Sequence, residues 1–312
     1  MPFSCESAKN SVSRVVAVMV EETSDGGRTI RTRDGLALAR RDWLSADARG
    51  TIVIVHGLGE HIGRYSHVAA RLNASGWSVV GYDQRGHGAS PGERGRIDSG
   101  DDLLVDLAAV VDEVRAEASG PMLLLGHSLG GLVVARFVAG ALESPKPAWQ
   151  RDVDALVLSS PALDIGMTAA RRALLATLQK LTPNLAIGNG LDVTGIARDP
   201  AVVAAYRADP LVHDRIVPRL VRFLADAGPT VLALAPRWQV PTLLLYAGRD
   251  RLVVPAGSRA FAAASPAGVV TARPFPSLFH EIFNEPEQDE VFGVLTAWLD
   301  TLNLTPTTRS PR

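Results

Sequence analysis

Cysteine, an excess of either charge and long apolar runs are all scarce in this chain of 312 residues. The single cysteine, Cys5, excludes an internal disulfide, and no Cys or His spacing typical of a zinc or iron–sulfur site occurs. Lys and Arg number 32 against 33 Asp and Glu, so the basic excess of most nucleic-acid-binding proteins is missing. No stretch reaches the roughly 18 apolar residues that a membrane-spanning helix needs. We therefore expect a cytoplasmic protein with no metal or organic cofactor and no nucleic-acid partner.

The amino-terminal residues carry a weak likeness to a signal peptide. The apolar run Val15–Val20 has six residues, fewer than the roughly 7–15 of a signal peptide, and Glu21 stands where a small residue is expected for cleavage. We interpret residues 1–27 as a flexible extension, with Met19 as an alternative start. Residues 304–312 are interpreted as a frayed tail.

Apolar residues make up 46% of the chain and fall into short runs that alternate with helical patterns. Eight runs have the composition of strands, at 29–33, 36–43, 51–55, 77–82, 121–126, 155–159, 241–247 and 268–275. Helical patterns lie near 64–74, 101–118, 129–141, 256–264 and 285–302. After a hairpin turned at Asp34-Gly35, this alternation is typical of a mostly parallel, doubly wound sheet. The sequence predicts an α/β fold with one insertion.

The insertion lies between the sixth and seventh predicted strands, where about eighty residues stand in place of one crossover. Apolar residues recur near helical spacing at Leu163, Met167, Leu174, Leu178 and Leu181. Prolines occur at positions 161, 183, 200, 210, 218, 229 and 236. They predict several short helices rather than one long pair. We predict a helical cap over 162–237, inserted into a core formed by 28–161 and 238–303.

A turn in the middle of the chain carries a candidate nucleophile. The pentapeptide Gly126-His127-Ser128-Leu129-Gly130 follows the apolar run Met122-Leu123-Leu124-Leu125 and precedes a helical pattern. Glycines two before and two after the serine allow strand and helix to pack closely, which exposes the hydroxyl at the edge of a sheet. A bare G-x-S-x-G is common by chance, so its placement between a strand and a helix is what favours Ser128.

A serine hydroxyl needs a base that takes its proton and an acid that orients the base. Asp250 follows the strand predicted at 241–247, and His280 follows the run 268–275. Taken alone, Asp250 also fits a turn paired with a neighbouring arginine, and His280 also fits a surface loop. Because they follow strands in the order Ser, Asp, His that α/β-hydrolases use, we predict the triad Ser128, Asp250 and His280.

Two backbone N–H groups are candidates to stabilise the negative charge of a tetrahedral intermediate. One belongs to Leu129, directly after the nucleophile and at the start of a helix. The other is assigned by position to Leu58, in the loop His56-Gly57-Leu58-Gly59-Glu60-His61 after the third strand. We interpret the histidines of these turns, including His127, as braces of the loops without a direct chemical role.

Together these segments resemble the monoacylglycerol lipase family of α/β-hydrolases, which also contains bacterial lysophospholipase-like enzymes. The resemblance runs from about Thr29 to Leu302. Its motifs are HGLGEH at 56–61 with Arg64-Tyr65, DQRGHGAS at 83–90, GHSLGG at 126–131, GRDRLV at 248–253 and HEIFNE at 280–285. The resemblance implies an α/β-hydrolase fold, the same triad and oxyanion donors, and a helical cap that forms the acyl channel and can rest on membranes.

The resemblance also implies a serine ester hydrolase that cleaves monoacylglycerols, or similar single-chain lipid esters, to fatty acid and glycerol through an acyl-enzyme. A lysophospholipase is an alternative, because arginines of the cap could bind the phosphate of a lysophospholipid. The candidates are Arg171, Arg172, Arg219 and Arg222. A broad carboxylesterase also stays open, and a non-catalytic lipid-binding scaffold is the alternative from another class. The predicted cap has nine basic against six acidic residues, which suits an anionic lipid surface. Acyl-chain length and oligomeric state are not predicted by the sequence.

Overall fold

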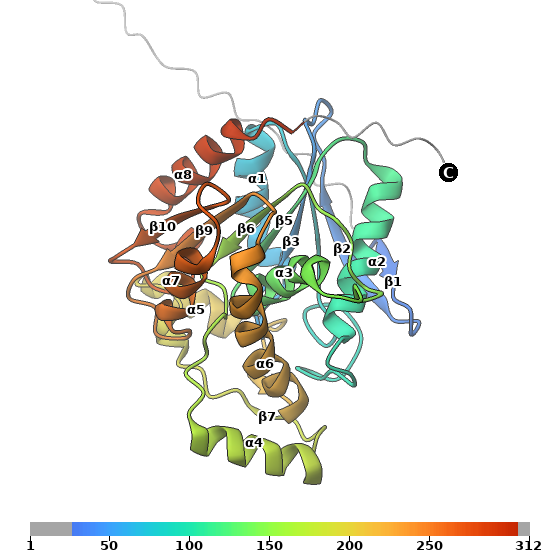
Figure 1. Ribbon diagram of the computed structural model, residues 1–312, viewed down its shortest axis with the longest axis vertical. Coiled ribbons are helices and arrows are strands. Elements are labelled where there is room, and N and C mark those ends of the chain that lie inside the picture. Colours follow the sequence, from blue (N-terminus) through green and yellow to red (C-terminus); the bar gives the residue numbers. More distant parts are fainter. Residues whose placement is uncertain (1–26, 305–312) are drawn as a thin grey trace, which may run out of the picture.

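An eight-stranded sheet lies at the centre of the computed structural model, which describes residues 27–304 (Figure 1). The strands are β1 (Thr29–Arg31), β2 (Ala37–Trp43), β3 (Thr51–Val55), β4 (Ser78–Tyr82), β5 (Met122–His127), β6 (Ala155–Ser159), β9 (Thr242–Ala247) and β10 (Val270–Phe275). Their order across the sheet is β1-β2-β4-β3-β5-β6-β9-β10. The pairs β1–β2 and β2–β4 are antiparallel, and the other neighbours pair parallel. Each strand overlaps a run predicted as a strand, so the mostly parallel eight-stranded sheet is confirmed.

Two of the predicted segments lie largely beyond the described residues. The predicted extension 1–27 is described only at Gly27, and the predicted tail 304–312 only at Leu304. Both assignments stay predictions.

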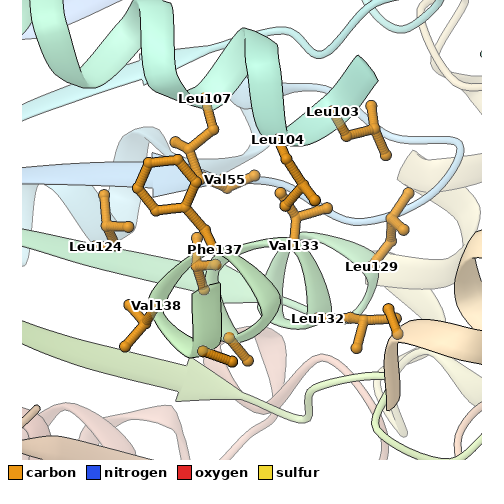
Figure 2. Packing of buried hydrophobic residues seen from close by; sticks show 14 of the residues in the cluster. Val55, Leu103, Leu104, Leu107, Leu124, Leu129, Leu132, Val133, Phe137 and Val138 are labelled. Atoms are coloured by element: carbon orange, nitrogen blue, oxygen red, sulfur yellow. The ribbon is translucent and has the colours of Figure 1, made fainter. Parts of the chain in front are cut away.

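Helices cover both faces of the sheet (Figure 1). Those of the core are α1 (Ser66–Ala74), α2 (Asp102–Glu117), α3 (Leu129–Ala139), α7 (Pro255–Ala264) and α8 (Gln288–Thr301), with single turns η1 (Ile62–Tyr65), η2 (Gly140–Leu142) and η5 (Ile282–Asn284). Successive side chains of a strand point to opposite faces, so Ile54 of β3 packs in the layer of α1 and α8. Its neighbour Val55 packs on the other face with Leu104 of α2 and Phe137 of α3 (Figure 2).

The register of the parallel strands brings their carboxyl ends to one edge. Val55 at the end of β3 pairs with Tyr82 of β4 and with Gly126 of β5. Further along, Phe275 of β10 pairs with Ala247 of β9. The loops that follow these strands therefore begin side by side, and this edge is where binding sites form on parallel sheets.

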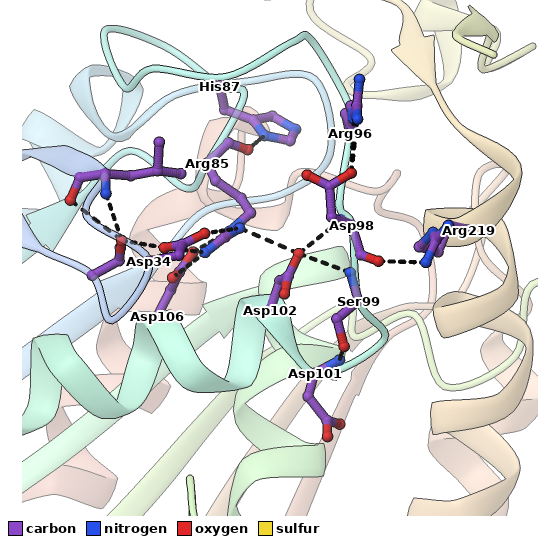
Figure 3. Close-up of polar contacts among 12 residues, drawn as sticks. Asp34, Arg85, His87, Arg96, Asp98, Ser99, Asp101, Asp102, Asp106 and Arg219 are labelled. Atoms are coloured by element: carbon purple, nitrogen blue, oxygen red, sulfur yellow. Dashed lines mark hydrogen bonds and ion pairs between the residues drawn. The ribbon is translucent and has the colours of Figure 1, made fainter. Parts of the chain in front are cut away.

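A buried ion cluster holds the loop after β4 at this edge (Figure 3). Arg85 binds both carboxylate oxygens of Asp106 on α2 at 2.6 Å, and it pairs with Asp34 at 3.0 Å and with Asp102 at 3.2 Å. The Asp106 side chain is 1% exposed. Burial raises the pKa of Asp106 even though Arg85 lies beside it. Arg85 therefore supplies the counter-charge that the buried Asp106 carboxylate needs in order to be ionised.

The helical insertion lies between β6 and β9, as predicted. It contains α4 (Ala169–Leu181), β7 (Ile187–Gly188), η3 (Val193–Gly195), α5 (Pro200–Ala208), β8 (Arg215–Ile216), α6 (Pro218–Leu234) and η4 (Ala235–Arg237). In Figure 1, α6 lies between the sheet and α4, so α4 forms the outer edge of the molecule. The boundaries 162 and 237 of a separate cap stay a prediction. None of the described helices combines the length and the apolar character that crossing a bilayer requires.

Two expectations about the insertion are wrong in detail. Pro229 does not end a helix, because it lies inside α6, which runs for 17 residues from Pro218 to Leu234. A proline inside a helix removes one hydrogen bond, and the packing of α6 on α3 and α7 compensates for that loss. Leu163 and Met167 precede α4, so their spacing does not reflect a helix. Leu163 is instead buried in the connection after β6.

Candidate active site

The turn between β5 and α3 holds Ser128 in a strained backbone conformation. Its φ is +53° and its ψ is −118°, a region that residues with a side chain rarely adopt. The Ser128 N–H donates to the Ser159 carbonyl at 3.0 Å, and the Ser128 carbonyl accepts from the N–H groups of Leu132 and Ala162 at 3.0 Å each. The surrounding backbone therefore maintains the strain, as expected for a turn that presents a serine hydroxyl at the edge of a sheet.

Glycines at positions 126 and 130 make this turn possible. A Cβ on Gly126 would lie 2.4 Å from the Gly130 carbonyl oxygen, and a Cβ on Gly130 would lie 2.1 Å from the Val55 carbonyl oxygen. Both separations are too short for a real contact, so a side chain at either position would push α3 away from the sheet. The G-x-S-x-G spacing thus reflects the close packing of β5, α3 and β3.

Asp250, which follows β9, and His280, which follows β10, are hydrogen-bonded to each other. The His280 Nδ1 donates to Asp250 Oδ2 at 2.7 Å, and the two side chains are 4% and 1% exposed. The second oxygen, Oδ1, accepts from the N–H groups of Leu252 at 2.9 Å and Val253 at 3.0 Å. Because the proton of the neutral ring lies on Nδ1, its Nε2 is left as a proton acceptor.

This pair shifts the ionisation of both partners. Burial favours the neutral form of Asp250, but the His280 charge and hydrogen bond outweigh it and lower the pKa of the carboxyl. Burial likewise opposes the charge on His280, but the Asp250 carboxylate outweighs it and raises the pKa of the imidazole above 6.5. The arrangement can therefore stabilise an imidazolium once the ring has taken a proton.

A cavity of about 620 Å³ is lined by both Ser128 and His280. Its apolar lining comes mostly from the insertion, from Ala162, Ile165, Ile196, Ile216, Val221 and Leu224, with Leu252 and Val253 from the core. Charged side chains also line it, from Arg171, Asp192 and Arg251. A cavity that combines apolar side chains of the insertion with a serine and a histidine on its wall fits a ligand that has both an apolar and a polar part.

The N–H groups of Leu58 and Leu129 belong to residues that line the same cavity. Among the described residues, neither N–H donates to a backbone or side-chain acceptor. Leu129 is the first residue of α3, where unpaired N–H groups and the helix dipole both favour an anion. Both residues thus line the cavity that Ser128 also lines, and the role of their N–H groups as oxyanion donors stays a prediction.

A buried ionic network lies beside these residues, and its members fall in motifs to which the sequence analysis gave no catalytic role. Glu60 pairs with Arg64, and it accepts from the Gly57 N–H at 2.6 Å and from the Tyr65 hydroxyl at 2.7 Å. Arg64 binds both carboxylate oxygens of Glu281 at 2.7 Å. Although burial opposes its ionisation, the charge of Arg64 lowers the pKa of Glu60 to about 2. The network joins the loop of Leu58 to the loop of His280.

The histidines of the two turns have loop-bracing contacts. The His56 ring accepts from the Gln84 N–H at 2.9 Å, and the Gln84 side chain returns a bond to the His56 carbonyl at 2.7 Å. The His127 Nδ1 lies 3.1 Å from Ser159 Oγ, and its ring centroid lies 4.7 Å from that of His280. Burial, together with the neighbouring His280, lowers the pKa of His127 to about 4. It is therefore neutral near pH 7 and does not add a charge beside His280.

Comparison with known proteins agrees with this geometry. The chain matches the family described as "Serine aminopeptidase, S33" over residues 46–287. It is 37% identical to the "Monoacylglycerol lipase" of Mycolicibacterium smegmatis over 81% of this chain and 89% of that protein. It is 30% identical to "Phospholipase YtpA" of Bacillus subtilis over 83% of this chain and 98% of that protein.

A solved structure gives the same result. The crystal structure of Paleococcus ferrophilus monoacylglycerol lipase matches with a TM-score of 0.74 and 36% identity, over 84% of this chain and 98% of that one. The family match over 46–287 spans β3 to β10, the insertion and the loops that carry Ser128, Asp250 and His280. The chain therefore belongs to the monoacylglycerol lipase family of α/β-hydrolases.

Proposed function

We propose that this protein is a serine ester hydrolase that cleaves monoacylglycerols or similar single-chain lipid esters, with Ser128, Asp250 and His280 as its catalytic triad. The observation that carries the proposal is the shared cavity, which is lined by a strained serine, by a histidine paired to a carboxylate and by apolar side chains of the insertion. The relatives named monoacylglycerol lipase support the substrate class.

The proposed mechanism uses the tautomer of His280 in which Nδ1 carries the proton and Nε2 is free to accept one. His280 accepts the hydroxyl proton of Ser128 on Nε2 while Ser128 Oγ attacks the ester carbonyl, and Asp250 stabilises the imidazolium through Nδ1. The N–H groups of Leu58 and Leu129 stabilise the oxyanion of the tetrahedral intermediate. The imidazolium then protonates the departing glycerol oxygen and leaves an acyl-enzyme. Water activated by the same ring releases the fatty acid and restores Ser128.

The charged part of the cavity lining bears on the choice between a glycerol ester and a lysophospholipid. Arg219 donates to the Asp98 carbonyl and Arg222 pairs with Asp226, so both are engaged away from the cavity. Arg251 lines the cavity but pairs with Asp192 at 3.1 Å. Arg171 is then the one cap arginine of the four candidates that lines the cavity. A lysophospholipase is the second candidate function, favoured by Arg171 and by the relative named phospholipase.

We also propose that the cap contacts the membrane surface from the cytoplasmic side through α4. Exposed apolar side chains gather on α4 and the segment after it, with Leu174 59%, Leu181 74% and Leu185 55% exposed. Arg172 and Lys180 lie on the same helix. Exposed leucines beside basic residues are typical of a helix that rests on an anionic lipid surface.

An ester panel tests the proposed function. Monooleoylglycerol, lysophosphatidylcholine and p-nitrophenyl esters of rising chain length are compared on the wild type and on Ser128→Ala. We expect the highest kcat/KM with monooleoylglycerol and a loss of about 10⁴-fold or more in the variant, with its fold intact by circular dichroism. A preference for lysophosphatidylcholine would assign the enzyme to the lysophospholipases instead. Undiminished turnover by Ser128→Ala would exclude the triad.

A further inference from the structure

The loop that carries Leu58 is attached to the cap as well as to the core. The next residue, Gly59, has a φ of +79°, and its carbonyl accepts from the His213 N–H at 2.9 Å. His213 belongs to the insertion, between α5 and β8. A Cβ on Gly59 would lie 2.4 Å from the His213 carbonyl oxygen, so the two backbones are in direct contact.

A side-chain contact joins the same two segments. His61 Nε2 lies 2.8 Å from Asp209 Oδ2, and the two side chains are 11% and 26% exposed. His61 Nδ1 accepts from the Gly63 N–H at 3.2 Å, so in the neutral ring the proton lies on Nε2 and is donated to Asp209. The other Asp209 oxygen accepts from the Leu211 N–H at 2.9 Å, which fixes the carboxylate at the end of α5.

An aromatic contact adds to these two. The ring of Tyr206, on α5, lies 4.7 Å from the guanidinium carbon of Arg64. Arg64 in turn pairs with Glu60, which belongs to the loop of Leu58. The cap segment Tyr206–His213 therefore contacts this loop at its backbone, at His61 and through Arg64.

Two of the hydrogen bonds flank the peptide that carries the Leu58 N–H. On the core side, the Gly57 N–H donates to Glu60 Oε1 at 2.6 Å. On the cap side, the Gly59 carbonyl is held by His213 at 2.9 Å. The backbone is thus held one peptide before and two peptides after the Gly57–Leu58 peptide. A donor fixed in advance stabilises a developing oxyanion most, because it does not have to reorient during the reaction.

We propose that the cap segment Tyr206–His213 positions the oxyanion donor Leu58, and that Asp209 is a positioning residue that acts through His61. This inference rests on the proposed function, since it takes the Leu58 N–H as a donor to the ester oxyanion. The cap then stabilises the transition state in addition to lining the acyl channel.

The test measures kcat and KM of Asp209→Ala with p-nitrophenyl butyrate, whose short acyl chain makes little use of the channel. We expect kcat to fall about 10-fold, less than the roughly 10²–10³-fold of a lost oxyanion donor, with KM changed by less than about twofold. The inhibition constant of a trifluoromethyl ketone, which forms a tetrahedral adduct with the serine, rises by the same factor as kcat/KM falls. A purely structural role would not link these two quantities.

Three further variants sharpen the test. Asp209→Asn keeps a side-chain oxygen for His61 and is expected to retain kcat within about threefold. Asp226→Ala removes an exposed cap carboxylate that pairs only with Arg222 among described residues, and it serves as the matched control with unchanged kcat. His61→Ala breaks the same contact from the core side, so the result does not depend on the folding of one variant. Because both partners act through one contact, the double variant loses no more than the more severe single variant.

The inference is overturned if Asp209→Ala keeps the wild-type kcat, if the ketone inhibition constant does not follow kcat/KM, or if the losses of the two single variants add. These outcomes differ from a failure of the proposed function. Activity in Ser128→Ala would contradict the triad itself. An inactive Ser128→Ala beside a fully active Asp209→Ala would contradict only the role of the cap segment.

Discussion

His280 is the residue whose ionisation most directly limits the proposed reaction. It must be neutral to accept the Ser128 proton, and the Asp250 carboxylate raises its pKa above 6.5. As the pH is lowered, the fraction of neutral His280 therefore begins to fall at a higher pH than it would for an ordinary histidine. Wild-type kcat/KM is accordingly expected to decline as pH drops through this raised value.

The substitution Asp250→Asn tests this pairing. It removes the carboxylate charge that raises the pKa of His280, so the acid limb of the kcat/KM profile moves to lower pH. It also favours the wrong tautomer of the ring, so we expect kcat to fall by about 10⁴-fold. Profiles of both proteins are measured from about pH 5 to 9 with a water-soluble ester. An acid limb that stays in place, or that moves upward, would contradict the pairing.

Arg85 has a structural role at the same scale. Replacing it with Ala leaves the buried Asp106 carboxylate without its counter-charge, which costs about 3–5 kcal/mol of unfolding free energy. Arg151→Ala is the matched control because Arg151 pairs with Asp112 in an exposed position, where the loss is below about 1 kcal/mol. Urea unfolding of the two variants distinguishes them. Equal stability of both would show that the Arg85 cluster contributes no more than a surface pair.

Among the elements, α4 differs from the other cap helices in its burial. Only Leu175 of α4 is buried, whereas α6 buries one side against α3 and α7. The segment from α5 to β8 is attached to the core by Asp209 and His213, as described above. The cap is therefore held firmly near the catalytic loops and loosely at α4, which agrees with α4 as the part that meets lipid.

The double variant Leu174→Ser/Leu181→Ser tests this assignment. Burial of a leucine contributes about 1.5–3 kcal/mol, so association with phosphatidylglycerol vesicles should weaken by at least about 10-fold in a sedimentation assay. Hydrolysis of p-nitrophenyl butyrate in solution should stay within about twofold. Leu44→Ser is the control, since Leu44 is 63% exposed but lies next to β2. If it reduces vesicle binding as much as the double variant does, α4 is not the contact site.

For the molecule as a whole, the core and the place of the helical insertion were predictable, whereas the internal packing of the cap was not. Runs such as Thr51–Val55 are apolar throughout because the strand is buried on both faces, and this signal is local in the sequence. The positions of Ser128, Asp250 and His280 follow from the same reasoning, because parallel strands end at one edge. The family, the fold and the enzyme class predicted from these motifs are confirmed.

The cap depends on tertiary packing that no local pattern reveals. Pro229 lies on the exposed side of α6 and is tolerated because the opposite side of the helix packs on α3 and α7. The position of a proline in the sequence therefore does not by itself show where that helix ends. The contacts of Asp209 and His213 with the loop of Leu58 join residues about 150 positions apart. Neither residue lies in a motif, so their contact with the loop of Leu58 is evident only in the folded structure.

The most direct measurement of the central claim is covalent labelling with a fluorophosphonate, followed by peptide mass spectrometry. The probe reacts with a serine that a neighbouring base has activated. We predict one adduct, on Ser128, that is absent from Ser128→Ala and forms more slowly in Asp250→Asn. An unlabelled protein, or an adduct on another residue that persists in Ser128→Ala, would contradict the catalytic assignment.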